Sequence, residues 1–292
     1  MSIIEQALEK GRGERRQRPP TRRPGDAEQG IEGADRGASL EAAKRIVGKR
    51  MPVDRDLCRE RRVLLDGTDD RDAGAIAAYR MLRTRLLQRT RTNKWTTIAV
   101  TSAGPNDGKT LTAINLALSM AREKSRDVVL LDLDMRNPSV CRTLGIDPPR
   151  ELRTCLELGD RFREPFFLIG NENLFIAGST TPTEHASELL AARHFDALLN
   201  AVREGVVNPI VLMDLPPVLL TDDALVVAPQ VDAVLVVASE GMTGRADLAK
   251  ALHVLSEFPI AGVVLNRATE STPGYDYAYS AGPADGPGGP PR

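Results

Sequence analysis

The chain has 292 residues, which is enough for one large domain or two small ones. Its 39 Lys and Arg residues nearly balance 40 Asp and Glu residues, so the whole chain has no net attraction to nucleic acid or anionic lipid. Hydrophobic residues make up 41% of the chain, which suffices for a packed core, and no apolar run reaches the roughly 18 residues that span a bilayer. Aromatic residues, at 4%, offer few stacking surfaces, so direct nucleic-acid recognition is not expected.

The two ends of the chain differ from its middle. Residues 1–72 and 270–292 are rich in Arg, Pro, Gly and acids and lack apolar periodicity, which predicts a largely disordered N-terminal extension and a flexible C-terminal tail. Ser2 and Glu5 fit a capping box, so residues 2–10 are predicted to form a short helix, with a frayed terminus as the alternative. No secretory signal or CxxC pair occurs, which indicates a cytoplasmic location.

The middle of the chain, residues 73–269, alternates buried apolar runs with helical patterns. Continuous Val, Ile and Leu runs indicate strands that are buried on both faces. We therefore expect an α/β domain with a mostly parallel sheet and helices on both faces. The predicted strands cover residues 97–101, 128–133, 174–177, 210–214, 233–238 and 260–266, and the predicted helices cover 111–123, 186–203 and 245–257.

A phosphate-loop pattern follows the first predicted strand and precedes a helix. It ends in Gly108-Lys109-Thr110, the Gly-Lys-Ser/Thr of nucleotide-binding loops. Gly108 lets the backbone approach phosphates, Lys109 neutralises β- and γ-phosphate charge, and the Thr110 hydroxyl binds Mg²⁺. The pattern predicts ATP and Mg²⁺ as cofactors, with these nucleotide contacts: Gly104, Pro105, Asn106, Asp107, Gly108, Lys109, Thr110 and Leu111.

Carboxylates end two other predicted strands. Asp132 and Asp134 lie two residues apart and point to the same face, and Asp214 ends the strand at 210–214. Any one of them alone is more often a helix cap or a turn residue. The carboxyl ends of parallel strands meet at one edge of a sheet, so together with the loop they indicate a magnesium–nucleotide site. The predicted metal ligands are Thr110, Asp132 and Asp214.

Residues 77–267 resemble the bacterial tyrosine kinases of capsule and exopolysaccharide synthesis, a group within the MinD- and ParA-like phosphate-loop ATPases. The resemblance implies that Asp132 or Asp134 helps to hold Mg²⁺ and activates a tyrosine hydroxyl, and that Lys109 and Asp214 complete the catalytic set. It also implies that Arg136 contacts the cofactor, and that Asn266 and Arg267 contact the base. The matching motifs are Thr101-Ser102, Gly108-Lys109-Thr110, the Asp-x-Asp-x-Arg box of Asp132, Asp134 and Arg136, and the Asp-x-Pro-Pro box of Asp214, Pro216 and Pro217.

Three of the four tyrosines, Tyr275, Tyr277 and Tyr279, lie within five residues of the tail. A tail of this composition does not pack easily, so phosphate can be added there without disrupting a core. Members of the family autophosphorylate a C-terminal tyrosine cluster, and the resemblance implies the same role here. The alternative is a short edge strand with alternating aromatic residues, although Pro273 and Gly274 disfavour it.

The resemblance implies an ATP-dependent tyrosine autokinase that regulates polysaccharide synthesis or export. We expect it to be recruited to the cytoplasmic face of the inner membrane by a chain-length regulator, a polysaccharide co-polymerase supplied in trans. Self-association is expected, but the family's oligomerisation helix has Glu where this chain has Ala77, which puts ring assembly in doubt. The alternatives are a partitioning-type ATPase switch and a nucleotide-dependent scaffold. The first is disfavoured because its signature lysine position is Gly104.

Overall fold

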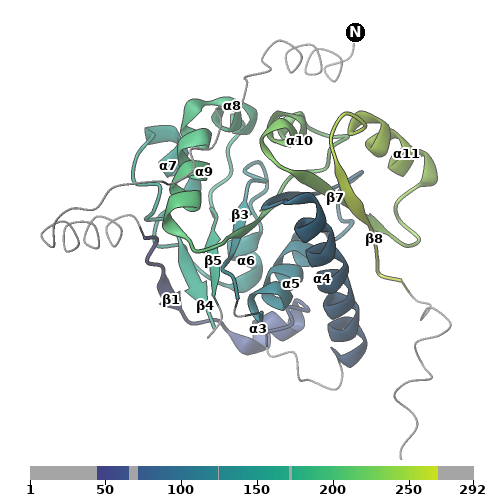
Figure 1. The fold of residues 1–292 in the computed structure, drawn as a ribbon, viewed down its shortest axis with the longest axis horizontal. Helices are drawn as coiled ribbons and strands as arrows, with labels where there is room; N and C mark the ends of the chain where they lie inside the picture. Colours follow the sequence, from purple (N-terminus) through teal and green to yellow (C-terminus); the bar gives the residue numbers. More distant parts are fainter. Residues whose placement is uncertain (1–44, 66–71, 124, 171–172, 269–292) are drawn as a thin grey trace, which may run out of the picture.

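The computed structural model describes residues 45–65, 72–123, 125–170 and 173–268. Within them an eight-stranded sheet has the order β1-β4-β5-β3-β6-β2-β7-β8 (Figure 1). Its pairs are parallel except β4 with β5, which is antiparallel. The mostly parallel sheet predicted from the sequence is confirmed. The strands are β1 (Lys49–Met51), β2 (Thr97–Ser102), β3 (Val128–Asp132), β4 (Phe167–Ile169), β5 (Leu174–Ala177), β6 (Ile210–Asp214), β7 (Ala233–Ser239) and β8 (Ile260–Asn266).

Helices cover both faces of the sheet. One layer comprises α3 (Arg55–Glu60), α4 (Ala73–Asn93), α5 (Lys109–Ala121) and α6 (Val140–Leu144). The other comprises α7 (Leu152–Leu158), α8 (Ala186–Ala191), α9 (Arg193–Gly205), α10 (Asp223–Val227) and α11 (Arg245–Val254), and a 3₁₀ turn, η2 (Ala228–Gln230), follows α10.

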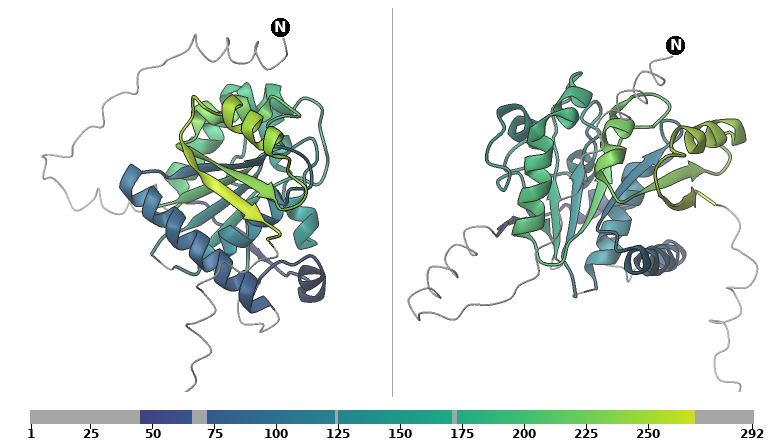
Figure 2. Two further views of the ribbon diagram at one scale, coloured as in Figure 1. Left: turned by 90° about the vertical axis from the view of Figure 1, so that its right-hand side faces the viewer. Right: turned by 45° about the horizontal axis from the view of Figure 1, so that its top comes forward.

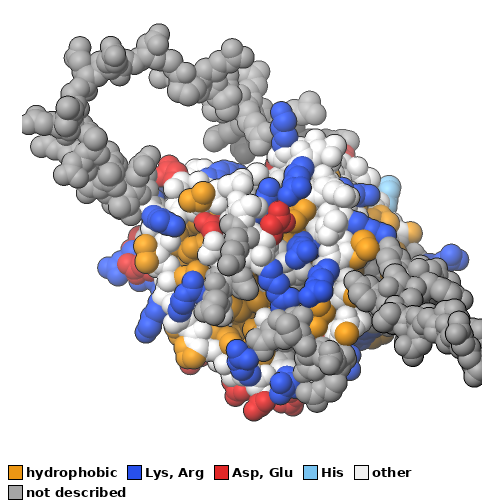
Figure 3. Space-filling view, turned by 60° about the horizontal axis from the view of Figure 1, so that its bottom comes forward, with side chains coloured by type: hydrophobic (Ala, Val, Ile, Leu, Met, Phe, Trp, Pro, Cys, Tyr) orange, Lys and Arg blue, Asp and Glu red, His pale blue; other side chains and the backbone are white. Residues whose placement is uncertain are grey.

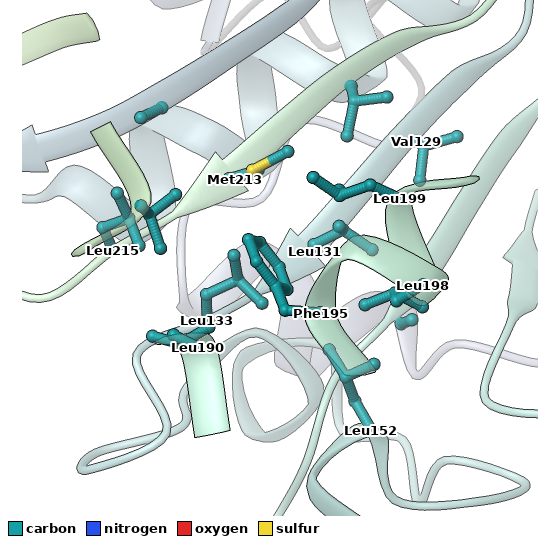
Figure 4. Close-up of a cluster of buried hydrophobic side chains, with 14 of the residues drawn as sticks. Val129, Leu131, Leu133, Leu152, Leu190, Phe195, Leu198, Leu199, Met213 and Leu215 are labelled. Carbon is teal, nitrogen blue, oxygen red and sulfur yellow. The ribbon is translucent and has the colours of Figure 1, made fainter. Parts of the chain in front are cut away.

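Each face of the sheet carries its own hydrophobic cluster because successive strand residues point to opposite sides. Val129 and Leu131 of β3 belong to the α9 side, whereas Val128 and Leu130 belong to the α5 side. Phe195 of α9 packs over the first of these faces (Figure 4). The continuous apolar runs of the sequence thus correspond to strands that are buried on both faces.

Two short segments lie in the domain although the sequence predicted them to belong to the N-terminal extension. Strand β1 pairs with β4 at the edge of the sheet, and helix α3 contributes the buried Cys58 to the α5-side cluster. Asp54 caps α3 by accepting hydrogen bonds from the backbone N–H groups of Asp56 and Leu57. The predicted domain start at residue 73 is therefore too late.

The predicted helix at 186–203 is interrupted at Ala192, whose extended backbone (φ −76°, ψ 151°) separates α8 from α9. Figures 1 and 2 place β8 and α11 at one end of the sheet, with β1 and β4 at the other. Among the described residues, no helix combines the length and apolar character that crossing a bilayer requires.

Helix α4 lies on the outside of the α5 layer and carries five arginines without an acid. Its Leu86 and Leu87 belong to the α5-side cluster, and Tyr79 and Leu82 pack against it. The lower face of the domain, seen in Figure 3, shows Lys and Arg side chains with apolar side chains between them. The whole chain is therefore nearly neutral, whereas α4 is strongly basic.

Candidate functional site

The phosphate loop connects β2 to α5 near the centre of the sheet. Gly108, the residue before α5, has a φ of +86°, which an L side chain rarely adopts. A Cβ at Gly108 would also overlap the side-chain nitrogen of Asn266 at the end of β8. Both features require glycine at position 108. The free backbone N–H groups at the start of α5 come directly after it in the chain. A Cβ at Gly104, in contrast, would have no neighbouring atom within 4 Å.

Buried Asp107 holds the loop in place. Its Oδ1 accepts a hydrogen bond from Thr243 Oγ1 at 2.6 Å, and its Oδ2 accepts one from the Gly104 N–H at 3.2 Å. Asn266 Nδ2 donates to the Asp107 carbonyl at 2.9 Å. The loop is thus tied to the segments that follow β7 and end β8. Sequence reasoning missed Thr243, which no pattern marks.

Lys109 and Thr110 meet the predicted carboxylates. Lys109 Nζ lies 2.7 Å from Asp134 Oδ2 and 3.7 Å from Asp214 Oδ1. Thr110 Oγ1 donates to Asp214 Oδ2 at 2.6 Å. Asp132 lies beside Asp214 because β3 and β6 pair in that register. The structure therefore brings together the loop and the strand-end acids that the sequence placed at one edge.

Asp132 is held at the start of α6. Its Oδ2 accepts hydrogen bonds from the backbone N–H groups of Ser139 and Val140, at 2.9 and 2.8 Å. Ser139 Oγ also donates to Thr110 Oγ1 at 3.1 Å. The sequence analysis missed Ser139, although a serine before an apolar helix is an N-cap signal that could have marked it.

Asp132 and Asp214 have raised pKa values. Burial, with the nearby Asp214 charge adding to it, raises the pKa of Asp132 to about 8. Burial also raises the pKa of Asp214, against the opposing charge of Lys109. Burial alone would lower the pKa of Lys109, but Asp214 and Asp134 raise it above its ordinary value. Three carboxylates thus face one ammonium, which leaves an excess of negative charge when all are ionised.

A divalent cation fits this excess charge. Asp132 Oδ1 and Asp214 Oδ1 are both buried without a hydrogen-bond partner, so each has a lone pair to offer. No group of three or more His, Cys, Asp or Glu side chains in the described part of the chain is arranged to hold a metal by itself. Mg²⁺ does not require one, because it usually takes one or two carboxylates and completes its shell with phosphates and waters.

Other predicted contacts have different surroundings. Arg136 is bound to α10: its Nε and Nη2 donate to the buried carboxylate of Asp223, at 2.9 and 3.2 Å. Arg136 also donates to the Glu184 carbonyl. The contact of Arg136 with the cofactor stays a prediction, and sequence reasoning missed Asp223 as its partner.

The remaining predicted contacts lie in or next to the loop, except the tail tyrosines. Pro105 and Asn106 are exposed at its tip, and Leu111 is half-buried in the first turn of α5. Arg267 Nη1 contacts Met242 Sδ at 2.6 Å, beside the segment that anchors Asp107. Tyr275, Tyr277 and Tyr279 lie outside the described residues.

A glycine-containing loop between a central parallel strand and a helix, with acids at the neighbouring strand ends, defines a phosphate-loop nucleotide-binding domain.

No protein-family model matches the sequence. The tyrosine-protein kinase CpsD of Streptococcus pneumoniae serotype 4 is 30% identical over 189 residues, which cover 60% of this chain and 77% of the relative. The tyrosine-protein kinase YwqD of Bacillus subtilis is 26% identical over 190 residues, covering 64% and 79%.

The kinase domain of the Escherichia coli tyrosine kinase ETK has the same fold. It superimposes with a TM-score of 0.63 at 23% identity and covers 80% of this chain and 96% of the solved one. From the sequence relatives, the chain belongs to the bacterial tyrosine-protein kinases that include CpsD. The resemblance stated from the motifs is confirmed.

Proposed function

We propose that this chain is an ATP- and Mg²⁺-dependent tyrosine autokinase that transfers the γ-phosphoryl group to Tyr275, Tyr277 or Tyr279 of its own tail. The observation that carries the proposal is the convergence of Lys109 and Thr110 with three acids at the carboxyl ends of β3 and β6. The family relation adds tyrosine as the acceptor.

The residues divide the work of phosphoryl transfer, which needs mainly positioning and charge neutralisation. Lys109 exchanges Asp134 for the β- and γ-phosphates. Thr110 Oγ1, Asp214 and the unpaired Oδ1 of Asp132 supply oxygen ligands to Mg²⁺. Mg²⁺ held by these residues would neutralise the charge that develops on the phosphates.

The proton of the tyrosine hydroxyl needs an acceptor, and Asp134 is better placed for this role than Asp132. Two backbone N–H groups fix one oxygen of Asp132, which is fully buried. The nearest cation to Asp134 is Lys109, and Asp134 loses this counter-ion when Lys109 turns to the phosphates. Asp134 is then a carboxylate free to accept the proton.

We further propose that tail phosphorylation regulates synthesis or export of an exopolysaccharide or capsular polysaccharide, through a membrane partner supplied in trans. Contact between copies is needed for phosphorylation in trans. Ala77 and Arg80 lie exposed on α4, whereas Arg83 Nη1 donates to the Ser119 carbonyl. Ala77 gives Arg80 and Arg83 of a neighbouring copy no carboxylate to bind, so we expect self-association through α4 to be weak.

The test measures phosphotyrosine after incubation with labelled ATP and Mg²⁺, with and without membranes that carry the partner. Wild type is expected to label its tail. Lys109→Ala should lose at least about 10²-fold in rate, as is typical when a charge-stabilising group is removed. The variant with all three tail tyrosines changed to Phe should lose the label while its nucleotide affinity stays at the wild-type value.

Two results would contradict the proposal. Equal labelling of the triple Phe variant would assign the acceptor elsewhere. Release of inorganic phosphate without any phosphotyrosine, under both membrane conditions, would instead favour the partitioning-type ATPase switch.

A further inference from the structure

A second concave site lies at the opposite end of the sheet from β8. It is an open groove of about 470 Å³, formed where the chain enters β1 and β4 and where the loop after α6 passes over them. Volumes in this range are typical of ligand sites. In the sheet, β4 and β5 separate β1 from β3, the nearest strand of the nucleotide site. Three strand spacings of about 4.8 Å each lie between them, so the groove is separate from the nucleotide site.

Four cations line this groove: Arg45, Lys49, Arg150 and Arg163. The only acid in its lining is Glu164. Arg150 is held by Asp160 at 3.2 Å and by Glu164 at 3.5 Å, so part of its charge is already compensated. The charge of Arg163 is less compensated. Its Nη2 lies 3.8 Å from Glu204, and its Nε is buried without a hydrogen-bond partner.

Arg45 and Lys49 have no carboxylate within ion-pair distance in the part of the chain that the structure describes. The groove therefore holds charge that its own acids do not neutralise. Its remaining wall is apolar and comprises Val47, Pro149 and the buried Phe166. Guanidinium groups beside an apolar wall match an anion attached to an aromatic ring, because the arginines pair with the oxygens and the wall contacts the ring.

This chain contains such a ligand if its tail is modified. Residues 269–285 contain Glu270, Asp276 and Asp285 and no Lys or Arg, with three tyrosines in between. Each phosphate adds between about 1.5 and 2 negative charges at neutral pH. Phosphorylation would thus convert a weakly acidic tail into a strongly anionic aromatic segment.

The tail of the same copy cannot reach the groove with its first tyrosine. Seven strand spacings separate β8 from β1, which at about 4.8 Å each amounts to about 34 Å. Tyr275 lies nine residues beyond Asn266 and extends at most about 32 Å. Tyr277 and Tyr279 lie eleven and thirteen residues beyond Asn266 and extend at most about 40 and 47 Å, so the length of the tail permits these two tyrosines to reach the groove.

We propose that the groove at the β1 edge binds the phosphotyrosine-bearing tail of this chain, residues 269–285. The inference rests on the proposed function for the origin of the phosphate, but the binding step is independent of it.

The experiment uses synthetic fluorescent peptides of residues 269–285, with all three tyrosines phosphorylated or with none. They are titrated into the full chain carrying Lys109→Ala, whose own tail stays unmodified, and anisotropy is recorded. We expect the phosphopeptide to bind at least 10-fold more tightly than its unmodified twin. Lys49→Ala with Arg163→Ala should remove at least 10-fold of that affinity, whereas the control pair Arg85→Ala with Arg245→Ala should not.

Lys49→Glu provides a second variant, because Lys49 is exposed and its change leaves the core intact. Thermal melting checks that each variant is folded. Equal binding of the two peptides, or full affinity in both Lys49 variants, would overturn the proposal. So would equal competition by a peptide of residues 26–41, which has five acids and one arginine, since the groove would then accept any acidic segment. Because the peptides are synthetic, failure here leaves the kinase proposal standing, and failure of autophosphorylation leaves the binding result standing.

Discussion

At the scale of single residues, Gly108 and Asn266 depend on each other. Gly108 has a left-handed backbone conformation, and the Asn266 amide occupies the space where its side chain would be. In this position the amide also bonds to the Asp107 carbonyl. A residue at the end of the last strand therefore shapes the phosphate loop directly.

We predict that Gly108→Ala loses at least about 10-fold in nucleotide affinity, because the new methyl group displaces Asn266 and strains the backbone by about 1 kcal/mol or more. Adding Asn266→Ala relieves the overlap but not the strain, so it should restore part of the affinity. Titration with a fluorescent nucleotide measures both. The matched control is Gly74→Ala in α4, which also has open space around it and lies outside the loop. If Gly74→Ala were as damaging as Gly108→Ala, the steric explanation would fail.

The catalytic candidates were predictable from the sequence because each follows a buried strand or belongs to the loop. Lys109, Thr110, Asp132, Asp134 and Asp214 all lie within one cluster, as parallel strand ends require. The position of Arg136 was not predictable. Its partner Asp223 is 87 residues further along the chain, and nothing local distinguishes that carboxylate from its half-buried neighbour Asp222.

At the scale of elements, Asp232 connects β2 with β7 at the amino ends of these two strands, which is the end of the sheet opposite the site. Its Oδ2 accepts hydrogen bonds from the backbone N–H groups of Thr96 and Thr97, at 2.7 and 3.0 Å, and from both threonine hydroxyls. Partial burial opposes ionisation, but these hydrogen bonds outweigh it and lower the pKa of Asp232. The carboxylate fixes the start of the strand that leads to the phosphate loop.

We predict that Asp232→Ala lowers the free energy of unfolding by about 2 kcal/mol at pH 7, because charged hydrogen-bond acceptors contribute about that much. A lowered pKa means that the contribution is complete above about pH 4 and is lost as the pH falls through the native value. Wild type and variant should therefore converge under acid. Urea denaturation at pH 7 and pH 3 measures this, and Asp247→Ala on the exposed face of α11 is the control. A constant difference at both pH values would rule out the charge as its cause.

The strands that the sequence predicted are those with long apolar runs, and the missed ones are short. β1 and β4 have three residues each, and β1 consists of Lys-Arg-Met. No periodicity can identify a strand of that length and polarity. Pairing at the edge of the sheet, rather than local sequence, makes β1 a strand, and for the same reason the antiparallel β4–β5 pair was not foreseeable.

At the scale of the whole molecule, a ligand at the central site should stabilise the entire domain. The loop contacts the segment after β7 and the end of β8, and the acids lie at the ends of β3 and β6. Residues from most of the strands therefore form the site. We predict that Mg²⁺–ADP at 100 times its Kd adds about 2.7 kcal/mol to the free energy of unfolding. For a domain of this size that raises Tm by several degrees.

Thermal melting with and without the nucleotide measures this effect. Lys109→Ala should show little shift at the same concentrations, because it lacks the phosphate-binding ammonium. A shift of equal size in the Lys109→Ala variant would place the stabilising nucleotide at another site. Melting with Mg²⁺ alone separates the contribution of the metal from that of the phosphates.

The ion pair between Lys109 and Asp134 has a further consequence for timing. While the pair is closed, the ammonium neutralises the group that we assign as proton acceptor, so an incoming hydroxyl finds no available base. When Lys109 turns to the phosphates of a bound nucleotide, Asp134 would lose its counter-ion and become available as the base in the same movement. If Asp134 has the role that we propose, the nucleotide must bind before the tyrosine reacts, and a tyrosine that binds first forms an unreactive complex.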